Sequence, residues 1–501
     1  MPQPIRIHPD NSKIFEFRGN PMVLNTACEH YGAVMNRPFR FDRYLEHCAE
    51  VGINYTRLFT LFRELQSAAN PYSTCKPEST DYVAPFERVG PDRSLDMQPK
   101  YDLTRWSAEF LDRLHGFLRK ASECGVIVEL VLFSNTYGNE NWNLNPLNSS
   151  NNINDVERSP WYHYNTLRNP KLVAFQEAYG RRMVQEVNRY DNLIIEICNE
   201  PGGGLGIPDS PEPEEVNEWL DHFIRLVRST EAELPNRHLI SGQEAFAYKM
   251  RDEPFNPIDV HQFSERSFSF KEMDYDVVTM HPLSNMKYGG KAHNLGRFMH
   301  AQLHLAAYRD YCLDTYAEHK PLILDEDNCA TQYRNRMGWT IHRKRAWTAI
   351  FCGAHYNMID FSILHCLEVG TEESRRYLRA CIGYLTRFVH SFDLLRAKPL
   401  PSLVLHQPDH ICASAFGIEG EDFAVYLADD REVDDKDAGN SIAGELKLNA
   451  PTGRYLISCF SPLTGETSPW IAVQSVGNGL SFTLPEFEHD IVVRAKCMAQ
   501  A

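Results

Sequence analysis

The stretch from Leu193 to Pro201 reads L-I-I-E-I-C-N-E-P, and it constrains the fold more than any other part of the chain. Four of its first five residues are large and aliphatic, as expected of a strand that is buried on both faces of a parallel sheet. The strand ends abruptly at Asn199-Glu200-Pro201, and three glycines follow. Barrel enzymes present catalytic side chains in this way, at the carboxyl ends of their strands.

Strands and helices alternate along most of the chain. Apolar runs bounded by Gly, Pro and Asp predict strands, and segments with helical spacing of apolar residues separate most of them. Eight such repeats favour a parallel sheet closed into an α/β fold of the (β/α)8 TIM-barrel class. The predicted strands are 21–26, 53–59, 126–133, the strand from Leu193, 238–241, 277–280, 322–325 and 354–361, and the predicted helices are 40–51, 103–124, 172–190, 214–234, 295–319 and 343–352.

The two ends of the chain have strand periodicity without helices. Residues 1–20 alternate around a Pro-Asp-Asn turn, which predicts a hairpin that either covers the barrel floor or joins the C-terminal sheet. Short apolar runs at 399–501 predict a small all-β domain, a sandwich. We therefore expect a catalytic barrel at 21–395 between these two parts. Within it, the polar connection that ends at Tyr101 predicts a long irregular loop over a site.

Composition excludes several classes of protein. The chain of 501 residues has 43% hydrophobic and 24% charged residues, which is typical of a soluble globular protein. A net charge of −16 and the lack of a long basic run argue against nucleic acid or an anionic membrane as partner. No apolar run is long enough to span a bilayer, and the N-terminus lacks signal-peptide features. Thirteen scattered cysteines indicate reduced thiols. We expect a cytoplasmic protein, or a secreted one if the sequence was trimmed, and the oligomeric state stays open.

A second carboxylate follows a later predicted strand, in the run K-P-L-I-L-D-E at 320–326. With Asn-Glu-Pro at the end of the fourth strand, the chain resembles the clan A glycoside hydrolases, retaining barrel enzymes such as family 5, over roughly residues 20–395. The segment from Gly453 to Gly465 resembles the β-sandwich that many of them carry. The resemblance implies a retaining β-glycoside hydrolase that cleaves a β-linked oligo- or polysaccharide, with Glu200 as general acid/base and Glu326 as nucleophile.

Glycoside hydrolysis requires two carboxyl groups that flank an oxocarbenium-like centre. Asp325 and Asp327 are the rivals of Glu326 for the role of nucleophile. Because side chains alternate along a strand, Asp325 and Glu326 cannot both face the barrel axis while the strand stays regular. The alternative interpretation of this run is a solvated acidic turn.

Two further residues are implied by the resemblance to contact the reacting groups. Arg57, at the end of the second strand, would touch the nucleophile and keep it ionised. Its alternative role is to neutralise Glu196 inside the barrel. Asn199 would bind the sugar 2-hydroxyl, and its alternative role is to cap the loop.

The remaining candidates lie at other strand ends. His30 and His281 end the first and sixth strands, where sugar hydroxyls would lie, and a structural histidine is the alternative for each. Asn135 and Trp142 follow the third strand in an Asn-rich loop; Trp142 either stacks on a sugar or anchors the loop by packing. The Tyr and Trp that the clan often carries at strands six and eight are absent, and Asp360-Phe361 stands in place of the Trp.

Three competing functions are less well supported. A metal-dependent barrel hydrolase would need His-x-His on the first strand, where only His30 occurs, so we expect no metal and no other cofactor. The presence of both carboxylates argues against a non-catalytic carbohydrate-binding barrel. The glycines at 202–204 lack the Lys-Ser/Thr ending of a phosphate-binding loop.

Overall fold

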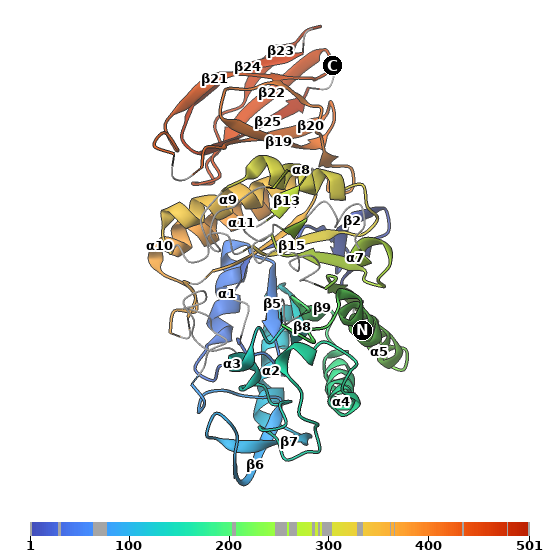
Figure 1. The fold of residues 1–501 in the computed structure, drawn as a ribbon. Coiled ribbons are helices and arrows are strands. Elements are labelled where there is room, and N and C mark those ends of the chain that lie inside the picture. Colours follow the sequence, from blue (N-terminus) through green and yellow to red (C-terminus); the bar gives the residue numbers. More distant parts are fainter. Residues whose placement is uncertain are drawn as a thin grey trace.

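Three regions of the protein stack along its long axis in the computed structural model (Figure 1). The C-terminal strands lie at one end and the barrel lies in the middle. The hairpin of β6 (Phe86–Arg93) and β7 (Pro99–Trp106) lies at the other end. The structure describes residues 3–28, 32–63, 78–202, 207–245, 258–259, 268–282, 286–288, 291–292, 303–327, 334–360, 362–364, 366–432, 435–477 and 479–498.

Eight parallel strands form the barrel, which confirms the predicted fold class. Their order in the sheet is β4-β16-β15-β12-β10-β9-β8-β5. In the described part of the chain no main-chain ladder joins β4 to β5, and a side chain links them instead. Asn54 accepts from the backbone N–H of Asn25 (3.0 Å) and donates to the carbonyl of Val23 (2.8 Å). The strands are β4 Asn25–Cys28, β5 Tyr55–Phe59, β8 Ile127–Ser134, β9 Leu193–Asn199, β10 Leu239–Gly242, β12 Val277–Met280, β15 Leu322–Asp327 and β16 His355–Ile359.

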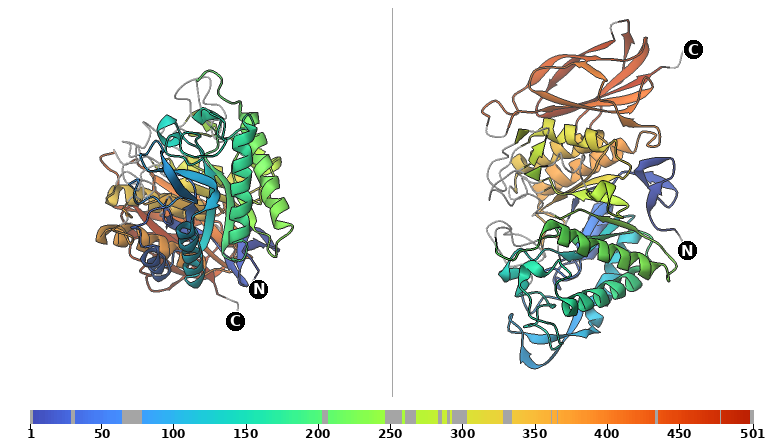
Figure 2. Two further views of the ribbon diagram at one scale, coloured as in Figure 1. Left: turned by 90° about the horizontal axis from the view of Figure 1, so that it is seen from below. Right: turned by 45° about the vertical axis from the view of Figure 1, so that its right-hand side comes forward.

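Helices surround this sheet, and two of them end or begin at a residue typical of helix caps. Gly52 adopts the left-handed conformation (φ 89°) directly after the first helix, and the side chain of Ser107 caps the second by accepting from the N–H of Phe110. Helices α4 and α5 lie side by side along the barrel (Figure 2). The helices are α1 Phe41–Val51, α2 Ala108–Glu123, α3 Asn139–Trp142, α4 Pro170–Val187, α5 Pro213–Glu231, α7 Phe268–Lys271, α8 Leu305–Thr315, α9 Arg336–Phe351, α10 Glu372–Ser374 and α11 Ala380–Val389, with single turns at η1 Trp161–His163 and η2 Arg375–Arg379.

The predicted helix at 103–124 is wrong in its first turn. Residues up to Trp106 belong to β7 (Pro99–Trp106), which pairs with β6 (Phe86–Arg93) in an antiparallel hairpin. Leu103 and Trp106 fit the helical spacing, but the chain becomes helical only after the Ser107 cap. The connection before α2 is therefore partly a hairpin rather than a wholly irregular loop. The predicted helix at 295–319 begins at Leu305 in the described residues, and 293–302 lie outside them.

The N-terminal strands close the floor of the barrel. Strands β1 (Arg6–His8), β2 (Asn11–Phe17) and β3 (Asn20–Met22) form a separate antiparallel sheet. The residues predicted as the start of the first barrel strand therefore pair with β2 instead. The sheet does not join the C-terminal strands. Its apolar side chains share one core with residues near the amino ends of the barrel strands, namely Ile5, Phe15, Phe17, Tyr55, Ile127, Ile194, Val277 and Ile323.

Two antiparallel sheets form the C-terminal all-β domain, as predicted. One has the order β17-β19-β20-β25-β22-β23, the other β18-β21-β24, and a core that includes Phe423, Leu446 and Ile457 lies between them. The strands of this domain are β17 Lys398–Pro399, β18 Val404–His406, β19 Ile411–Ile418, β20 Asp422–Asp429, β21 Ile442–Leu448, β22 Gly453–Phe460, β23 Ile471–Ser475, β24 Leu480–Phe487 and β25 Asp490–Cys497. A separate small sheet, outside this domain, contains β11 Ile258–Asp259, β13 Met286–Tyr288 and β14 Lys291–Ala292.

The outer face of the larger sheet packs on the barrel through α9. Trp347 of α9 stacks on Tyr426 with ring centroids 5.4 Å apart. Beside it, the guanidinium of Arg343 and the carboxylate of Asp490 form a buried pair, Nε to Oδ2 at 2.9 Å. Among the described residues, no helix is both long and apolar enough to cross a membrane.

Candidate active site

The two carboxylates that the sequence singles out meet at the carboxyl ends of their strands. Glu200 directly follows β9, and Glu326 lies in the last part of β15. Both are largely buried, at 8% and 2% exposure. Both also have left-handed backbones, with φ of 46° and 51°. Non-glycine residues rarely adopt this conformation, and they often do so at functional sites.

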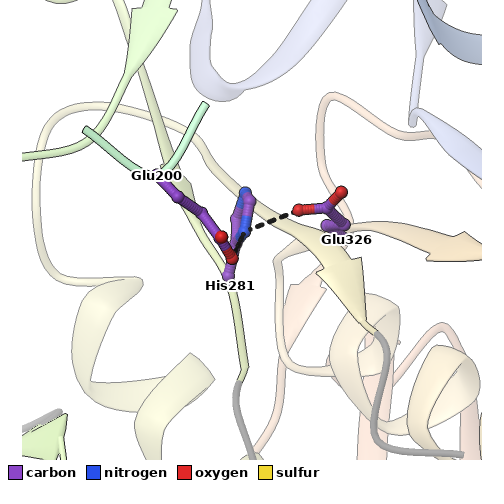
Figure 3. Close-up of side chains that lie close together, drawn as sticks. All are labelled: Glu200, His281 and Glu326. Atoms are coloured by element: carbon purple, nitrogen blue, oxygen red, sulfur yellow. Dashed lines mark hydrogen bonds and ion pairs between the residues drawn. The ribbon is translucent and has the colours of Figure 1, made fainter. Parts of the chain in front are cut away.

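His281 lies between the two carboxylates (Figure 3). Its Nδ1 is 2.9 Å from Oε1 of Glu200 and 2.9 Å from Oε2 of Glu326. Burial by itself lowers the pKa of His281, but the charge of Glu326 and the hydrogen bonds to both carboxylates outweigh it and raise the pKa to about 10. The ring is therefore an imidazolium at neutral pH. Clan A glycoside hydrolases often carry a tyrosine near the end of the sixth strand, and here the cationic His281 stands there instead.

The two carboxylates are close to each other as well as to the histidine. One oxygen of Glu200, one oxygen of Glu326 and a ring nitrogen of His281 all lie within 4.8 Å of one another. The two carboxylates and the imidazole therefore form one compact group.

Arg57 lies inside the barrel and is at ion-pair distance from acids on three other strands, including Glu129 of β8 (3.7 Å). It donates to Oε2 of Glu196 from Nε (3.0 Å) and Nη2 (2.5 Å), and Nη2 also donates to Oδ1 of Asn199 (3.0 Å). Its Nε is 2.8 Å from Oδ2 of Asp325, whereas Nη1 is 3.7 Å from Oε1 of Glu326. Arg57 thus neutralises Glu196 and also lies at ion-pair distance from Glu326, but beyond hydrogen-bond distance of it.

A β-bulge brings Asp325 and Glu326 to the same site. Leu324 pairs with Tyr356 and Asp327 pairs with Met358, so Asp325 and Glu326 together oppose one residue of β16. The strand is therefore not regular here, so the condition under which only one of the two acids could face the centre does not hold.

The three acids at the end of β15 have different partners. Asp325 accepts from Asn357 and pairs with Arg57, whereas Glu326 reaches His281. Asp327 accepts from Arg345 (2.8 Å) and Tyr356 (3.0 Å). All three acids are buried, so the alternative of a solvated acidic turn is also wrong.

A second group of acids surrounds Arg57 below the site. Glu129, Glu196 and Asp325 are fully buried, and one carboxylate oxygen of each lies within 4.8 Å of the others. Burial raises the pKa of Glu196 to about 7 and that of Asp325 well above its usual range, against the opposing effect of Arg57. The guanidinium of Arg57 lies at ion-pair distance from all three acids and supplies a positive charge to this group.

Asn199 and Asn135 belong to a hydrogen-bond network beside Glu200. The side chain of Asn199 accepts from Arg57 and donates to the hydroxyl of Tyr137 (2.9 Å) and to Ser134 (3.3 Å). The backbone N–H of Asn135 donates to the carbonyl of Asn199 (3.0 Å), and its side chain accepts from the N–H of Tyr137 (3.0 Å). Asn135 therefore shapes the turn that places Tyr137.

Tyr137 is a site residue that the sequence analysis missed. Its hydroxyl donates to Oε2 of Glu200 at 2.6 Å. The only signal in the sequence was its position three residues after the end of β8, at the same edge of the barrel as Asn199.

Two other candidates do not contribute to the described site. Trp142 is 4% exposed, its indole N–H donates to the carbonyl of Ser159 (3.0 Å), and its ring packs against Tyr164. It anchors the loop, as in the alternative interpretation, and is not an open platform for a sugar. His30 lies outside the described residues.

Comparison with known proteins agrees with this geometry. Residues 83–326 match the family model Cellulase (glycosyl hydrolase family 5). A solved structure titled glycoside hydrolase is similar over 100% of this chain and 98% of its own, with 12% identity and a TM-score of 0.60. A family 5 glycoside hydrolase from Bacteroides vulgatus ATCC 8482 is similar over 99% of this chain and 94% of its own, with 14% identity and a TM-score of 0.59. No curated protein sequence matches.

At these identities the structural similarity supports the fold, and the family model covers the barrel segment that contains Glu200 and Glu326. The prediction of a clan A enzyme is confirmed. Residues 83–326 are therefore similar to family 5 glycosyl hydrolases, and the barrel that contains them carries a C-terminal β-sandwich domain.

Proposed function

We propose that the protein is a retaining β-glycoside hydrolase that cleaves a β-linked oligo- or polysaccharide by double displacement. One observation supports this most directly: an oxygen of Glu200 and an oxygen of Glu326 lie within 4.8 Å of each other. Retaining enzymes place their carboxyl groups about 5 to 5.5 Å apart, whereas inverting enzymes need roughly 6.5 to 9.5 Å to admit a water between carboxylate and sugar.

The reaction begins with attack by Glu326 on the anomeric carbon. Glu200 gives its proton to the glycosidic oxygen as the bond between that oxygen and the anomeric carbon breaks. The aglycone leaves, and the sugar remains attached to Glu326 as an ester. Glu200 then takes a proton from water, whose oxygen attacks the anomeric carbon and releases Glu326. Two inversions give net retention.

The surrounding charges suit these two roles. The His281 imidazolium lies 2.9 Å from both carboxylates, but Arg57 lies 3.7 Å from Glu326, so Glu326 has the second cation that favours an ionised nucleophile. No comparable guanidinium contact to Glu200 is found in the described residues. Glu200 is therefore the better candidate for the carboxyl group that carries a proton.

The Glu200→Gln variant tests this proposal. Without the acid, cleavage of substrates with poor leaving groups should fall by about 10² to 10⁴-fold, while activated aryl β-glycosides, which need little protonation, should lose far less. Azide should restore turnover by attacking the glycosyl-enzyme. The control is Glu231→Gln, because Glu231 is also buried and hydrogen-bonded to a histidine, His238 (2.6 Å), at the start of β10.

Equal losses on both classes of substrate, without rescue by azide, would contradict the assignment of Glu200. Binding of β-glycans without any cleavage by the wild-type protein would instead favour a carbohydrate-binding barrel. Loss of cleavage on treatment with a chelator would favour a metal-dependent hydrolase.

A further inference from the structure

Tyr137 has a conformation that needs support from its neighbours. It follows β8 with a left-handed backbone, φ 56°, which is uncommon for an aromatic residue. Its N–H donates to the side chain of Asn135, and the N–H of Gly138 donates to the carbonyl of Thr136 (2.8 Å). Its ring packs edge-on against Phe62 with centroids 5.8 Å apart. Although the residue as a whole is 42% exposed, these contacts hold its hydroxyl against Glu200.

The direction of each hydrogen bond around Tyr137 can be assigned. A guanidinium only donates, so the group of Asn199 that lies 3.0 Å from Arg57 is its oxygen. The amide nitrogen of Asn199 then faces Tyr137 and donates to its hydroxyl oxygen (2.9 Å). The hydroxyl hydrogen is left for Oε2 of Glu200 (2.6 Å). A directed chain of hydrogen bonds thus runs from Arg57 through Asn199 and Tyr137 to Glu200.

The two oxygens of Glu200 therefore have different surroundings. Oε2 accepts from Tyr137, whose hydrogen is committed to it. Oε1 lies 2.9 Å from Nδ1 of His281, and the single hydrogen on that nitrogen is shared with Oε2 of Glu326, which is equally close. Oε1 is therefore the oxygen of Glu200 with the less committed donor, and it is available to hold a proton.

We propose that Tyr137 is a positioning residue that occupies Oε2 of Glu200, so that the proton given to the leaving group and recovered from water is carried on Oε1. This inference rests on the proposed function. The other described groups near the carboxyl of Glu200 are His281, Glu326 and the buried thiol of Cys198. Burial raises the pKa of Cys198 well above its usual range, so this thiol carries no charge at neutral pH.

The Tyr137→Phe variant tests the hydroxyl alone, since the ring remains. Cleavage of substrates with poor leaving groups should fall about 10-fold in kcat, whereas activated aryl glycosides and KM should change less than about 3-fold. The control is Tyr190→Phe, whose hydroxyl contacts His115 (3.1 Å) away from the site.

Equal losses on both classes of substrate, or no loss on substrates with poor leaving groups, would overturn the role of Tyr137. A double-mutant cycle of thermal unfolding with Tyr137→Phe and Glu200→Met gives a second test that needs no activity. Coupled changes in Tm are expected, and additive changes would overturn the inference. If the wild-type protein cleaves no glycoside but the cycle shows coupling, the proposed function fails while the contact stands.

Discussion

Replacing His281 with Asn removes a positive charge between the two carboxylates and keeps a neutral donor in place of Nδ1. The pKa of His281 is raised from the ordinary value of 6.5 to about 10, a difference of about 3.5 pH units. At about 1.4 kcal/mol per pH unit, the folded protein gains about 5 kcal/mol from holding this proton. This contribution is fully present below pH 6.5 and is lost as the pH rises to 10, because the folded state holds the proton more tightly than the unfolded state.

The assay is denaturant unfolding of the wild type and His281→Asn between pH 6 and 10. The wild type should be more stable than the variant at pH 6, and the difference should shrink by roughly 5 kcal/mol towards pH 10. The difference in unfolding free energy between the two proteins removes the contribution of groups that titrate in both. His238→Asn is the matched control, since His238 is a buried partner of Glu231 near the amino end of β10.

The same variant tests the catalytic role of the imidazolium. With only a neutral donor beside Glu326, the acid limb of the kcat/KM profile should move up by about 1 to 3 pH units, since an adjacent positive charge favours the ionised nucleophile. A stability difference that does not change with pH, together with an unmoved acid limb, would refute the account of His281 as a cation shared by Glu200 and Glu326.

Three further predictions follow from the contacts around the site and between the domains. Glu326→Gln should lower kcat by on the order of 10⁴-fold or more, and Asp325→Asn by far less, because Glu326 lies 2.9 Å from the ring nitrogen of His281 that also contacts Glu200, whereas Asp325 lies 3.9 Å from the other ring nitrogen; steady-state kinetics on one aryl glycoside compares them. Arg57→Met should destabilise the barrel more at pH 8 than at pH 6. The pKa of Glu196 is about 7, so its carboxylate is charged at pH 8 and then lacks its partner; thermal unfolding at the two pH values measures this. Asp490→Asn should cost about 3 to 5 kcal/mol by leaving Arg343 buried without its carboxylate, with kcat/KM of the folded enzyme unchanged.

The barrel could be predicted from the sequence because its strands are short apolar runs and its helices are amphipathic. The run from Leu193 to Asn199 is buried throughout, and this explains why a mostly apolar pattern, interrupted by Glu196, marked it so clearly. The hairpin of β6 and β7 was harder to predict. Its sequence is polar and largely exposed in β6, so no alternation of apolar residues marks it.

The details of the site depend on departures from regular structure. The rule of alternating side chains failed at Asp325 and Glu326 because a bulge adds one residue to β15, and no pattern in the run L-D-E-D announces it. Tyr137 was missed because its contact with Glu200 depends on a left-handed turn that is held by Asn135 and packed on Phe62. Trp142 was placed in the correct loop, but sequence alone could not distinguish a buried anchor from an open platform.

The configuration of the first sugar released tests the central claim most directly. The proximity of Glu200 and Glu326 predicts double displacement, in which the anomeric carbon is inverted twice. Proton NMR of an aryl β-glycoside cleaved by a large amount of enzyme, recorded before mutarotation, identifies the first anomer. The account predicts the β-anomer. An α-anomer as first product would contradict it, even if both carboxylates proved essential.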